Sequence, residues 1–140
     1  MKRILLDTNA YTRLLTGDTH VLDEVAEAEQ VHLSVFVMGE LLAGFRGGTK
    51  LQQNRQLLKT FLAKSTVSLL GATAETAEIF GQIKNDLRKA GTPLPINDVW
   101  IAAHAMETGS VLVTYDGHFR EVPGLRLWGQ ILSSPAELME

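Results

Sequence analysis

Residues 4–9 read Ile-Leu-Leu-Asp-Thr-Asn, and residues 111–117 read Val-Leu-Val-Thr-Tyr-Asp-Gly. Each stretch is a short apolar run that ends in residues favoured at helix caps and turns. A continuous apolar run of this length is typical of a strand buried on both faces, as in a parallel sheet. The two stretches therefore predict two buried strands, each with an acidic residue, Asp7 or Asp116, just beyond its carboxyl end.

The rest of the chain alternates between helical and strand patterns. Helices are expected over residues 10–15, 21–29, 36–46 and 51–63, over a long segment that Thr73 caps and Gly91 ends, and from a cap at Asn97 to about Glu107. Further strands are expected over 31–34, 66–70 and 125–127, and Ser134-Pro135-Ala136-Glu137 has the pattern of a helix start. This alternation predicts an α/β sandwich around a short, mostly parallel sheet, as a single domain over residues 1–140.

Composition narrows the class of protein. The chain is 45% hydrophobic and 21% charged, which is typical of a globular domain. It has no cysteine, which excludes disulfides, thiolate nucleophiles and cysteine zinc sites. Asp7 interrupts the first apolar run, and no uncharged run approaches the roughly 18–20 residues of a membrane span, so we expect a cytoplasmic protein with no membrane contact. A net charge of −3 lacks the basic excess common in nucleic-acid-binding proteins.

Four of the 16 acidic residues stand alone in otherwise uncharged stretches. Asp7 is the only formal charge in residues 4–12, Glu40 in 33–45, Asp98 in 92–106 and Asp116 in 109–119. An ionised carboxylate in apolar surroundings costs several kcal/mol unless something pairs with it. No nearby Lys or Arg along the sequence is in position to do so.

The expected topology gives these acids a place to meet. Asp7 and Asp116 follow buried strands at the sheet edge where open α/β folds form ligand crevices. Asp98 falls in the first turn of a helix entered from the same side, and Glu40 near the start of the helix after the second strand. Four convergent carboxylates would repel one another unless a hard cation lies between them. Oxygen ligands favour Mg²⁺, with Mn²⁺ as a substitute, and such a site suits metal-assisted phosphodiester hydrolysis.

Each acid also has an ordinary structural interpretation. Asp7 could cap the first helix, Asp98 could be stabilised by a helix dipole, and Asp116 before Gly117 could belong to a turn. Capping does not explain Glu40, which lies within an apolar helical segment. Taken together, these interpretations leave four unpaired acids unexplained, so we favour a shared metal site.

Other candidates are less specific. Arg13, Arg46 and Lys84 could contact RNA phosphates, although a solvated helix face explains each of them equally well. The histidines lack a two-histidine metal spacing, and neither a phosphate-binding glycine loop nor a nucleophile elbow is present. On amphipathicity alone, the helices over 21–29 and 51–63 are the candidates for partner contact.

Four motifs together resemble the PIN-domain family. They are Asp7-Thr8-Asn9 after the first strand, Glu40 within Val-Met-Gly-Glu-Leu-Leu-Ala-Gly, Asn97-Asp98-Val-Trp-Ile-Ala-Ala, and residues 113–119, Val-Thr-Tyr-Asp-Gly-His-Phe. The following Val122-Pro123-Gly124-Leu125 is typical of VapC toxins within that family. The similarity runs from about residue 1 to residue 128, with the motifs in order and at suitable intervals.

The resemblance implies a Rossmann-like α/β/α sandwich and an Mg²⁺- or Mn²⁺-dependent endoribonuclease. It implies the toxin half of a type II toxin–antitoxin pair that cleaves RNA, such as tRNA, to inhibit translation. It also implies a homodimer silenced by a VapB-type antitoxin, whose C-terminal segment lies over the acidic groove. Carried over by position, Asp7, Glu40, Asp98 and Asp116 become catalytic and metal-binding acids. Thr114 would hydrogen-bond within the cluster, and Asn9 would help to orient Asp7.

Two alternatives from other functional classes are open at this point. A receiver-like phosphoacceptor domain also places acids at strand ends and binds Mg²⁺, but it usually has an acidic pair after its first strand and a Lys after its last. Here Asp7 stands alone and no Lys follows Val113. The second alternative is a non-catalytic domain of the same fold that binds nucleic acid or protein. Metal-dependent RNA cleavage would separate it from an enzyme.

Overall fold

The computed structural model describes residues 1–132. Its centre is a four-stranded, all-parallel sheet in the order β3-β2-β1-β4. The strands are β1 (Arg3–Leu6), β2 (Gln30–Ser34), β3 (Val67–Leu70) and β4 (Val111–Val113). The predicted α/β class and the two predicted buried strands are confirmed, with β1 inside the sheet and β4 at its edge.

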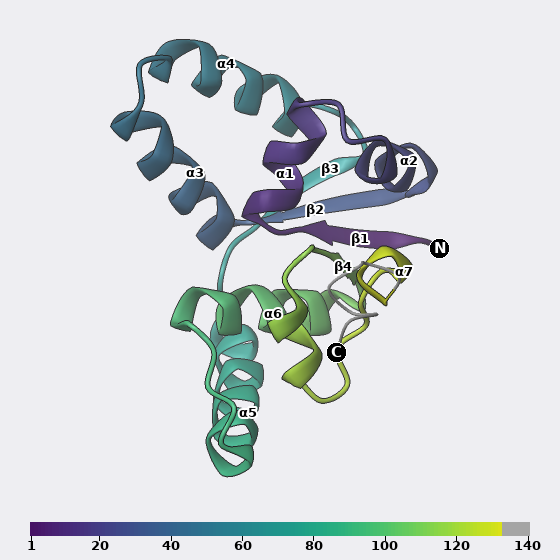
Figure 1. Cartoon of the computed structure of the whole chain (residues 1–140), viewed down its shortest axis with the longest axis vertical. Coiled ribbons are helices and arrows are strands. Elements are labelled where there is room, and N and C mark those ends of the chain that lie inside the picture. The colour runs from purple at the N-terminus through teal and green to yellow at the C-terminus, as the bar shows by residue number, and fades with distance from the viewer. Residues whose placement is uncertain (133–140) are drawn as a thin grey trace.

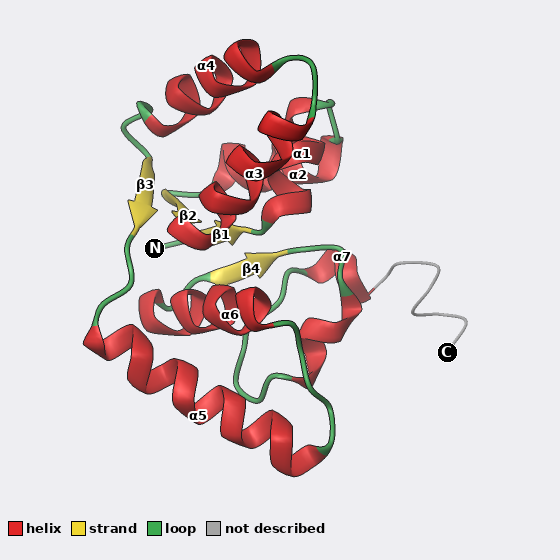
Figure 2. Cartoon of the chain, turned by 90° about the vertical axis from the view of Figure 1, so that its left-hand side faces the viewer, coloured by secondary structure: helices red, strands yellow, loops and turns green. Residues whose placement is uncertain are grey.

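Helices cover both faces of the sheet (Figures 1 and 2). One layer holds α1 (Thr8–Leu15), α2 (Thr19–Glu27), α3 (Val35–Gly47) and α4 (Leu51–Leu62). The opposite layer holds α5 (Ala74–Ala90), α6 (Ile96–Thr108) and the 3₁₀ helix η1 (Gly117–Glu121), and α7 (Gly129–Leu132) ends the described chain. No helix within residues 1–132 is both long enough and apolar enough to cross a lipid bilayer.

The burial of the strands follows from their apolar sequences. Ile4, Leu5 and Leu6 of β1 have no solvent exposure, because β1 is flanked by β2 and β4 and covered on both faces. Burying one such side chain stabilises the fold by about 1.5–3 kcal/mol. At the sheet edge, by contrast, Leu69 of β3 is 44% exposed.

The helix ends match their local signals with one exception. Thr73 caps α5 in a capping box with Thr76, and Gly91 ends it in a left-handed conformation with φ of 72°. The prediction that Asn97 caps α6 is wrong. The N-cap is Pro95, two residues earlier, because its carbonyl already accepts a hydrogen bond from the Val99 amide, so Asn97 lies inside the first turn.

The predicted strand over residues 125–127 is only a single bridge between Leu112 and Leu127. A left-handed Gly124, with φ of 79°, precedes it, and α7 begins two residues after it, which leaves no room for a longer ladder. The helix-start pattern over residues 134–137 lies outside the described residues.

The strand order fixes where a ligand site can form. The chain adds β2 and β3 on one side of β1 and then crosses to place β4 on the other side. The connections therefore diverge between β1 and β4, and in open α/β sheets the carboxyl ends of such a pair border a crevice. Leu6 pairs with Val113 in register, so the next residues, Asp7 and Thr114, lie side by side at this edge.

Candidate active site

Asp7 is anchored at the end of β1. It is 6% exposed, and its Oδ1 accepts a hydrogen bond of 2.8 Å from the Ala10 amide, which makes it the N-cap of α1. Its Oδ2 accepts a hydrogen bond of 2.5 Å from the Thr114 hydroxyl. Burial raises the pKa of Asp7, as do Asp116 and Glu40, and the two hydrogen bonds only partly oppose this rise. The carboxylate is therefore held in a fixed position at an energetic cost.

Thr114 connects three parts of the site. It is fully buried at the end of β4, where its hydroxyl donates to Asp7 and accepts a hydrogen bond of 3.0 Å from the Asp116 amide. The indole N–H of Trp128 donates to the Thr114 carbonyl at 2.5 Å. The predicted hydrogen bond of Thr114 within the cluster is present, and Trp128 holds the same residue from the other side.

Asp116 lies just beyond β4 and caps η1. Its Oδ1 accepts hydrogen bonds from the backbone amide of His118, at 2.9 Å, and from Nδ1 of the same residue, at 2.8 Å. The Asp116 side chain is 35% exposed and the His118 side chain 81% exposed. Both groups can therefore reach a ligand arriving from solvent.

Asp98 occupies the first turn of α6, where the helix dipole favours a negative charge. Burial nevertheless raises the pKa of Asp98 to about 6, and Asp116, Glu40 and Asp7 add to the rise while His118 opposes it. Electrostatic interaction with each of the other three acids means that the fold brings all four together. We call Asp7, Glu40, Asp98 and Asp116 the acidic cluster.

Glu40 is the exposed member of the acidic cluster. It projects from α3, whose Val37 and Leu41 face the core, and its Oε1 accepts a hydrogen bond of 2.8 Å from the Thr8 hydroxyl. Within residues 1–132, no three Asp, Glu or His side chains lie close enough together to ligate one ion as they stand. The four carboxylates are therefore spaced too widely to form a preformed cage.

The remaining candidate residues lie at different distances from the acidic cluster. Asn9 and Arg13 line a hollow of about 410 Å³ together with Asp116. Asn9 is exposed, and the hydrogen bonds that orient Asp7 come from Ala10 and Thr114 instead. Lys84 lines a separate hollow of about 250 Å³ that Val99, the neighbour of Asp98, also borders. Arg46 lies in the last turn of α3, six residues and therefore about 9 Å of helix beyond Glu40.

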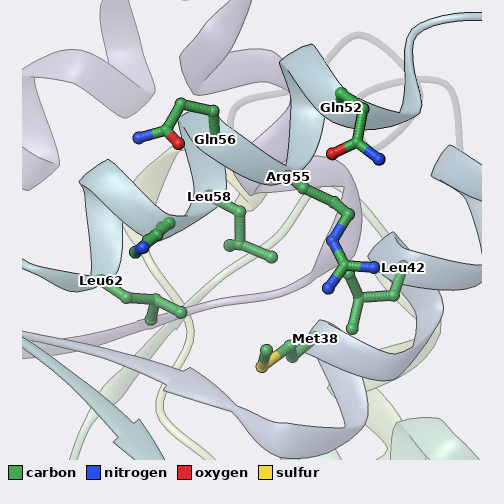
Figure 3. Close-up of a pocket in the computed structure, with 8 residues that line it drawn as sticks. Met38, Leu42, Gln52, Arg55, Gln56, Leu58 and Leu62 are labelled. Carbon is green, nitrogen blue, oxygen red and sulfur yellow. The ribbon is translucent and has the colours of Figure 1, made fainter.

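A third hollow, of about 430 Å³, separates α3 from α4 (Figure 3). Apolar side chains from both helices line it, and polar and basic side chains of α4 surround them: Met38, Leu42, Leu58 and Leu62, with Gln52, Arg55, Gln56 and Lys59. No member of the acidic cluster lines this groove. We call it the α3–α4 groove.

Three supporting side chains were missed in the sequence. Trp128 follows no motif that would mark it as a partner of Thr114, and its role depends on the chain turning back at Gly124. Thr8 stands beside Asp7 in the first motif, but its partner Glu40 is 32 residues away. Tyr115 donates a hydrogen bond of 2.8 Å to Asp18, which is 97 residues away. Thr8 and Tyr115 each carried a signal, because they stand in the first and fourth motifs, but neither motif indicated the distant partner.

Comparisons with known proteins show which family and which solved structures the chain is similar to. The PIN domain family profile matches residues 4–125. The chain is similar to Ribonuclease VapC2 of Haemophilus influenzae, with 30% identity over 129 residues that cover 90% of this chain and 96% of the relative. It is also similar to the tRNA(fMet)-specific endonuclease VapC of Salmonella typhimurium, with 26% identity and coverage of 91% and 97%. Among solved structures, DNA-bound VapBC from Salmonella typhimurium superposes with a TM-score of 0.81 at 27% identity, covering 91% of this chain and 98% of the other.

Proposed function

Because this chain belongs to the PIN domain family, we propose that it is a metal-dependent endoribonuclease and the toxin of a VapBC-type pair. The observation that carries the proposal is the meeting of four otherwise isolated acids at the carboxyl edge of β1 and β4. Carboxylates gathered in this way, with raised pKa values on two of them, need a cation to remain ionised together. The relatives named as ribonucleases and endonucleases supply the reaction class.

The donor set fits Mg²⁺ or Mn²⁺. It offers carboxylate oxygens and no thiolate, which favours a hard cation. Since no three acidic or histidine side chains of residues 1–132 form a ready ligand cage, an ion would be held by one or two carboxylates, with water in its other positions. This is the usual way in which proteins hold Mg²⁺. A bound ion would offset the charge of the acids, polarise a phosphate oxygen and make a water molecule more acidic.

The protein's own residues would position the reaction. Asp7 is held by Thr114 and by the first turn of α1, so its carboxylate cannot turn away from the crevice. Of the other three acids, Asp116 has the largest effect on the pKa of Asp98. Glu40 would act from the exposed side. Cleavage at this site would leave a 5′-phosphate and a 3′-hydroxyl.

We take tRNA as the first substrate class to test. The basis is the printed name of the Salmonella typhimurium relative, a tRNA(fMet)-specific endonuclease similar over nearly the whole of both chains. Cutting a tRNA in the cytoplasm would inhibit translation, as a toxin of this type requires.

We propose the α3–α4 groove as the docking site of a VapB-type antitoxin segment. Residues 41–74 contain five basic residues, Arg46, Lys50, Arg55, Lys59 and Lys64, and no acidic residue. An apolar floor beneath Arg55 and Lys59 is complementary to an amphipathic segment with an acidic face. The neighbouring VapBC structure is a toxin–antitoxin complex, which favours a protein occupant. We also propose that the protein forms a homodimer and that a further part of the antitoxin lies over the acidic cluster.

The experiment is cleavage of total RNA and of a bacterial initiator tRNA by antitoxin-free protein, with Mg²⁺ or with EDTA, beside Asp98→Asn. Discrete fragments that require the metal and vanish in the variant are expected. Purified Asp7→Asn and Asp98→Asn proteins that both cleave at near-normal rates would refute the assignment of the acidic cluster. A folded protein that binds RNA and never cuts it would indicate a binding domain.

A further inference from the structure

The hollow next to Asp116 has a cation fixed in its wall. The Arg13 guanidinium lies over the Tyr115 ring, 4.2 Å from its centroid, which is a cation–π arrangement. The Tyr115 hydroxyl donates a hydrogen bond of 2.8 Å to Asp18 Oδ2, and Arg13 Nη1 lies 3.5 Å from the same oxygen. Arg13, Tyr115 and Asp18 therefore form one unit, drawn from α1, the end of β4 and the cap of α2.

This unit is anchored at two points. Asp18 caps α2 by accepting hydrogen bonds from the amides of His20 and Val21, so its carboxylate is fixed to the backbone. On the other side, the Tyr115 ring packs edge-on against Trp128, with centroids 5.1 Å apart and planes at 79°. Because Tyr115 is held from both sides, the guanidinium above it has little side-chain entropy left to lose when it binds a ligand.

Arg13 keeps most of its binding capacity in this arrangement. Its side chain is 53% exposed, and the ion pair with Asp18 uses Nη1 at the long distance of 3.5 Å. A guanidinium has five N–H donors, and its edges suit a phosphate through two parallel hydrogen bonds. Ion pairs between exposed side chains contribute little to stability, so an incoming phosphate can compete with Asp18 for the Arg13 guanidinium.

We propose that Arg13, stacked on Tyr115, binds the RNA phosphate adjacent to the one that is cleaved. The inference rests on the proposed ribonuclease function, which places the scissile phosphate at the acidic cluster. The same hollow joins Asp116 to Arg13, and among residues 1–132 Arg13 is the only cationic side chain that lines it. A backbone leaving the cluster through this hollow brings its next phosphate past Asp116, which repels it, and towards Arg13, which attracts it. Asp18 and Tyr115 are positioning residues for Arg13.

The test measures RNA binding in a cleavage-deficient Asp98→Asn background. The probe is a fluorescein-labelled transcript of bacterial initiator tRNA, and anisotropy is followed from low to high salt. We expect Arg13→Gln to weaken binding by about tenfold and to reduce the slope of log K against log salt by about 0.7–0.9. The matched control is Lys89→Gln, which removes the same charge from an exposed position in the last turn of α5 and should leave affinity and slope unchanged.

Two further variants separate charge from position. Arg13→Lys keeps the charge and loses the planar fork, so it should bind more weakly with an unchanged salt slope. Tyr115→Phe keeps the ring beneath Arg13 and loses the hydrogen bond to Asp18, so it too should weaken binding without changing the slope. These variants decide the question even if Arg13→Gln fails to fold, as judged by its thermal unfolding temperature.

The outcomes distinguish this inference from the proposed function. RNA binding by the parent protein that is insensitive to Arg13→Gln, or weakened with an unchanged salt slope, would overturn the phosphate contact and leave the ribonuclease proposal standing. An absence of RNA binding by the parent would overturn both. Once the cleavage position is known, a single uncharged methylphosphonate beside it should weaken binding to the parent protein only. Equal weakening of the parent and of Arg13→Gln would show that Arg13 does not hold that phosphate.

Discussion

At the scale of single residues, the acids of the cluster have structural and chemical roles at once. Asp7 caps α1 and is also a buried carboxylate beside other acids, and Asp116 caps η1 in a similar way. The ordinary interpretation of each residue and the functional one therefore do not compete. At Asp7, the cap fixes the position of the carboxylate, and burial disfavours its charge.

Substitutions at Asp7 should separate these two roles. Asn is as good an N-cap as Asp, so Asp7→Asn should keep the thermal stability of the wild type and reduce cleavage by about 100-fold or more. Asp7→Ala removes the cap and leaves the buried Thr114 hydroxyl without its acceptor, so it should also cost about 1–3 kcal/mol of unfolding free energy. Urea unfolding and cleavage assays on both variants check this. Equal destabilisation by Asn and Ala would contradict the capping role.

The raised pKa of Asp98 predicts a pH-dependent stability of the metal-free protein. Between pH 3.8 and about 6 the folded state holds a proton that the unfolded state has released, so stability falls as pH rises through this window. Above pH 6 the ionised Asp98 lowers the unfolding free energy by its full amount. The pKa difference alone corresponds to about 3 kcal/mol, and screening by water at this partly exposed site reduces this to about 1–2 kcal/mol.

Asp98→Asn should accordingly raise the unfolding temperature of metal-free protein at pH 7.5 by about 3–6 °C and have little effect at pH 4. Mg²⁺ should stabilise the wild type more at pH 7.5 than at pH 5, and should stabilise the variant less than the wild type. Asp23→Asn, at an exposed position on α2, is the matched control. A variant that is no more stable than the wild type at pH 7.5 would show that Asp98 carries no such penalty.

At the scale of elements, the sequence predicted the presence of the helices and strands well, and the residues at which they begin and end less well. Apolar runs and caps such as Thr73 are local signals, and they placed α5 and β4 almost to the residue. Asn97 was misplaced because the preceding Pro95 already provides the first carbonyl of α6. The isolation of four acids in uncharged stretches led to the prediction of the acidic cluster. No local pattern indicated the role of Trp128, because its contact with Thr114 depends on a turn at Gly124.

A buried histidine connects three elements of the fold. His104 of α6 lies 2.8 Å from the hydroxyl of Ser34, the N-cap of α3, and 3.1 Å from the Gly71 carbonyl that precedes α5. A carbonyl only accepts, so Nε2 carries the proton and Nδ1 accepts from Ser34. Burial lowers the pKa of His104, and the ring is neutral in the folded state.

This link should weaken in acid. The unfolded state takes up the proton first as pH falls below the ordinary value of 6.5, so the contribution of His104 is present above that pH and is lost below it. Between pH 7.5 and 5.5 the wild type should lose unfolding free energy relative to His104→Gln, by at most about 1.4 kcal/mol for the one pH unit below the ordinary pKa of 6.5. The comparison with the variant cancels the effects of His32 and Asp98. Parallel pH profiles for the two proteins would contradict the prediction.

At the scale of the whole molecule, charge is segregated along the chain. Residues 41–74 carry +5, and the net charge is −3, so the remaining residues carry −8, the difference between the two. The chain has no overall excess of basic residues, but it has a local one in residues 41–74, which include the end of α3 and the whole of α4. We call this segment the basic arm. Net charge alone, as read from the composition, could not show this.

Charge reversal on this arm should separate partner binding from catalysis. Arg55→Glu with Lys59→Glu places acids at the rim of the α3–α4 groove, so an acidic antitoxin segment should dissociate at least about tenfold faster. Cleavage of RNA by the free variant should remain close to that of the wild type. Surface plasmon resonance with the paired antitoxin measures the first effect, with Lys89→Glu on α5 as the control. Unchanged dissociation would place the antitoxin elsewhere.

The pairing of β1 with β4 also has a consequence for the order of events during synthesis. Ile4 of β1 pairs with Val111 of β4, so these paired residues are 107 positions apart in sequence. The hydroxyl that holds Asp7 is present only once Thr114 has been synthesised. Contacts this distant form late and together. A nascent chain that stops before residue 111 has an unpaired β1 edge and lacks Asp116. A growing polypeptide therefore completes the acidic cluster in one step, once residues 111–116 have been made, and shorter translation products lack it.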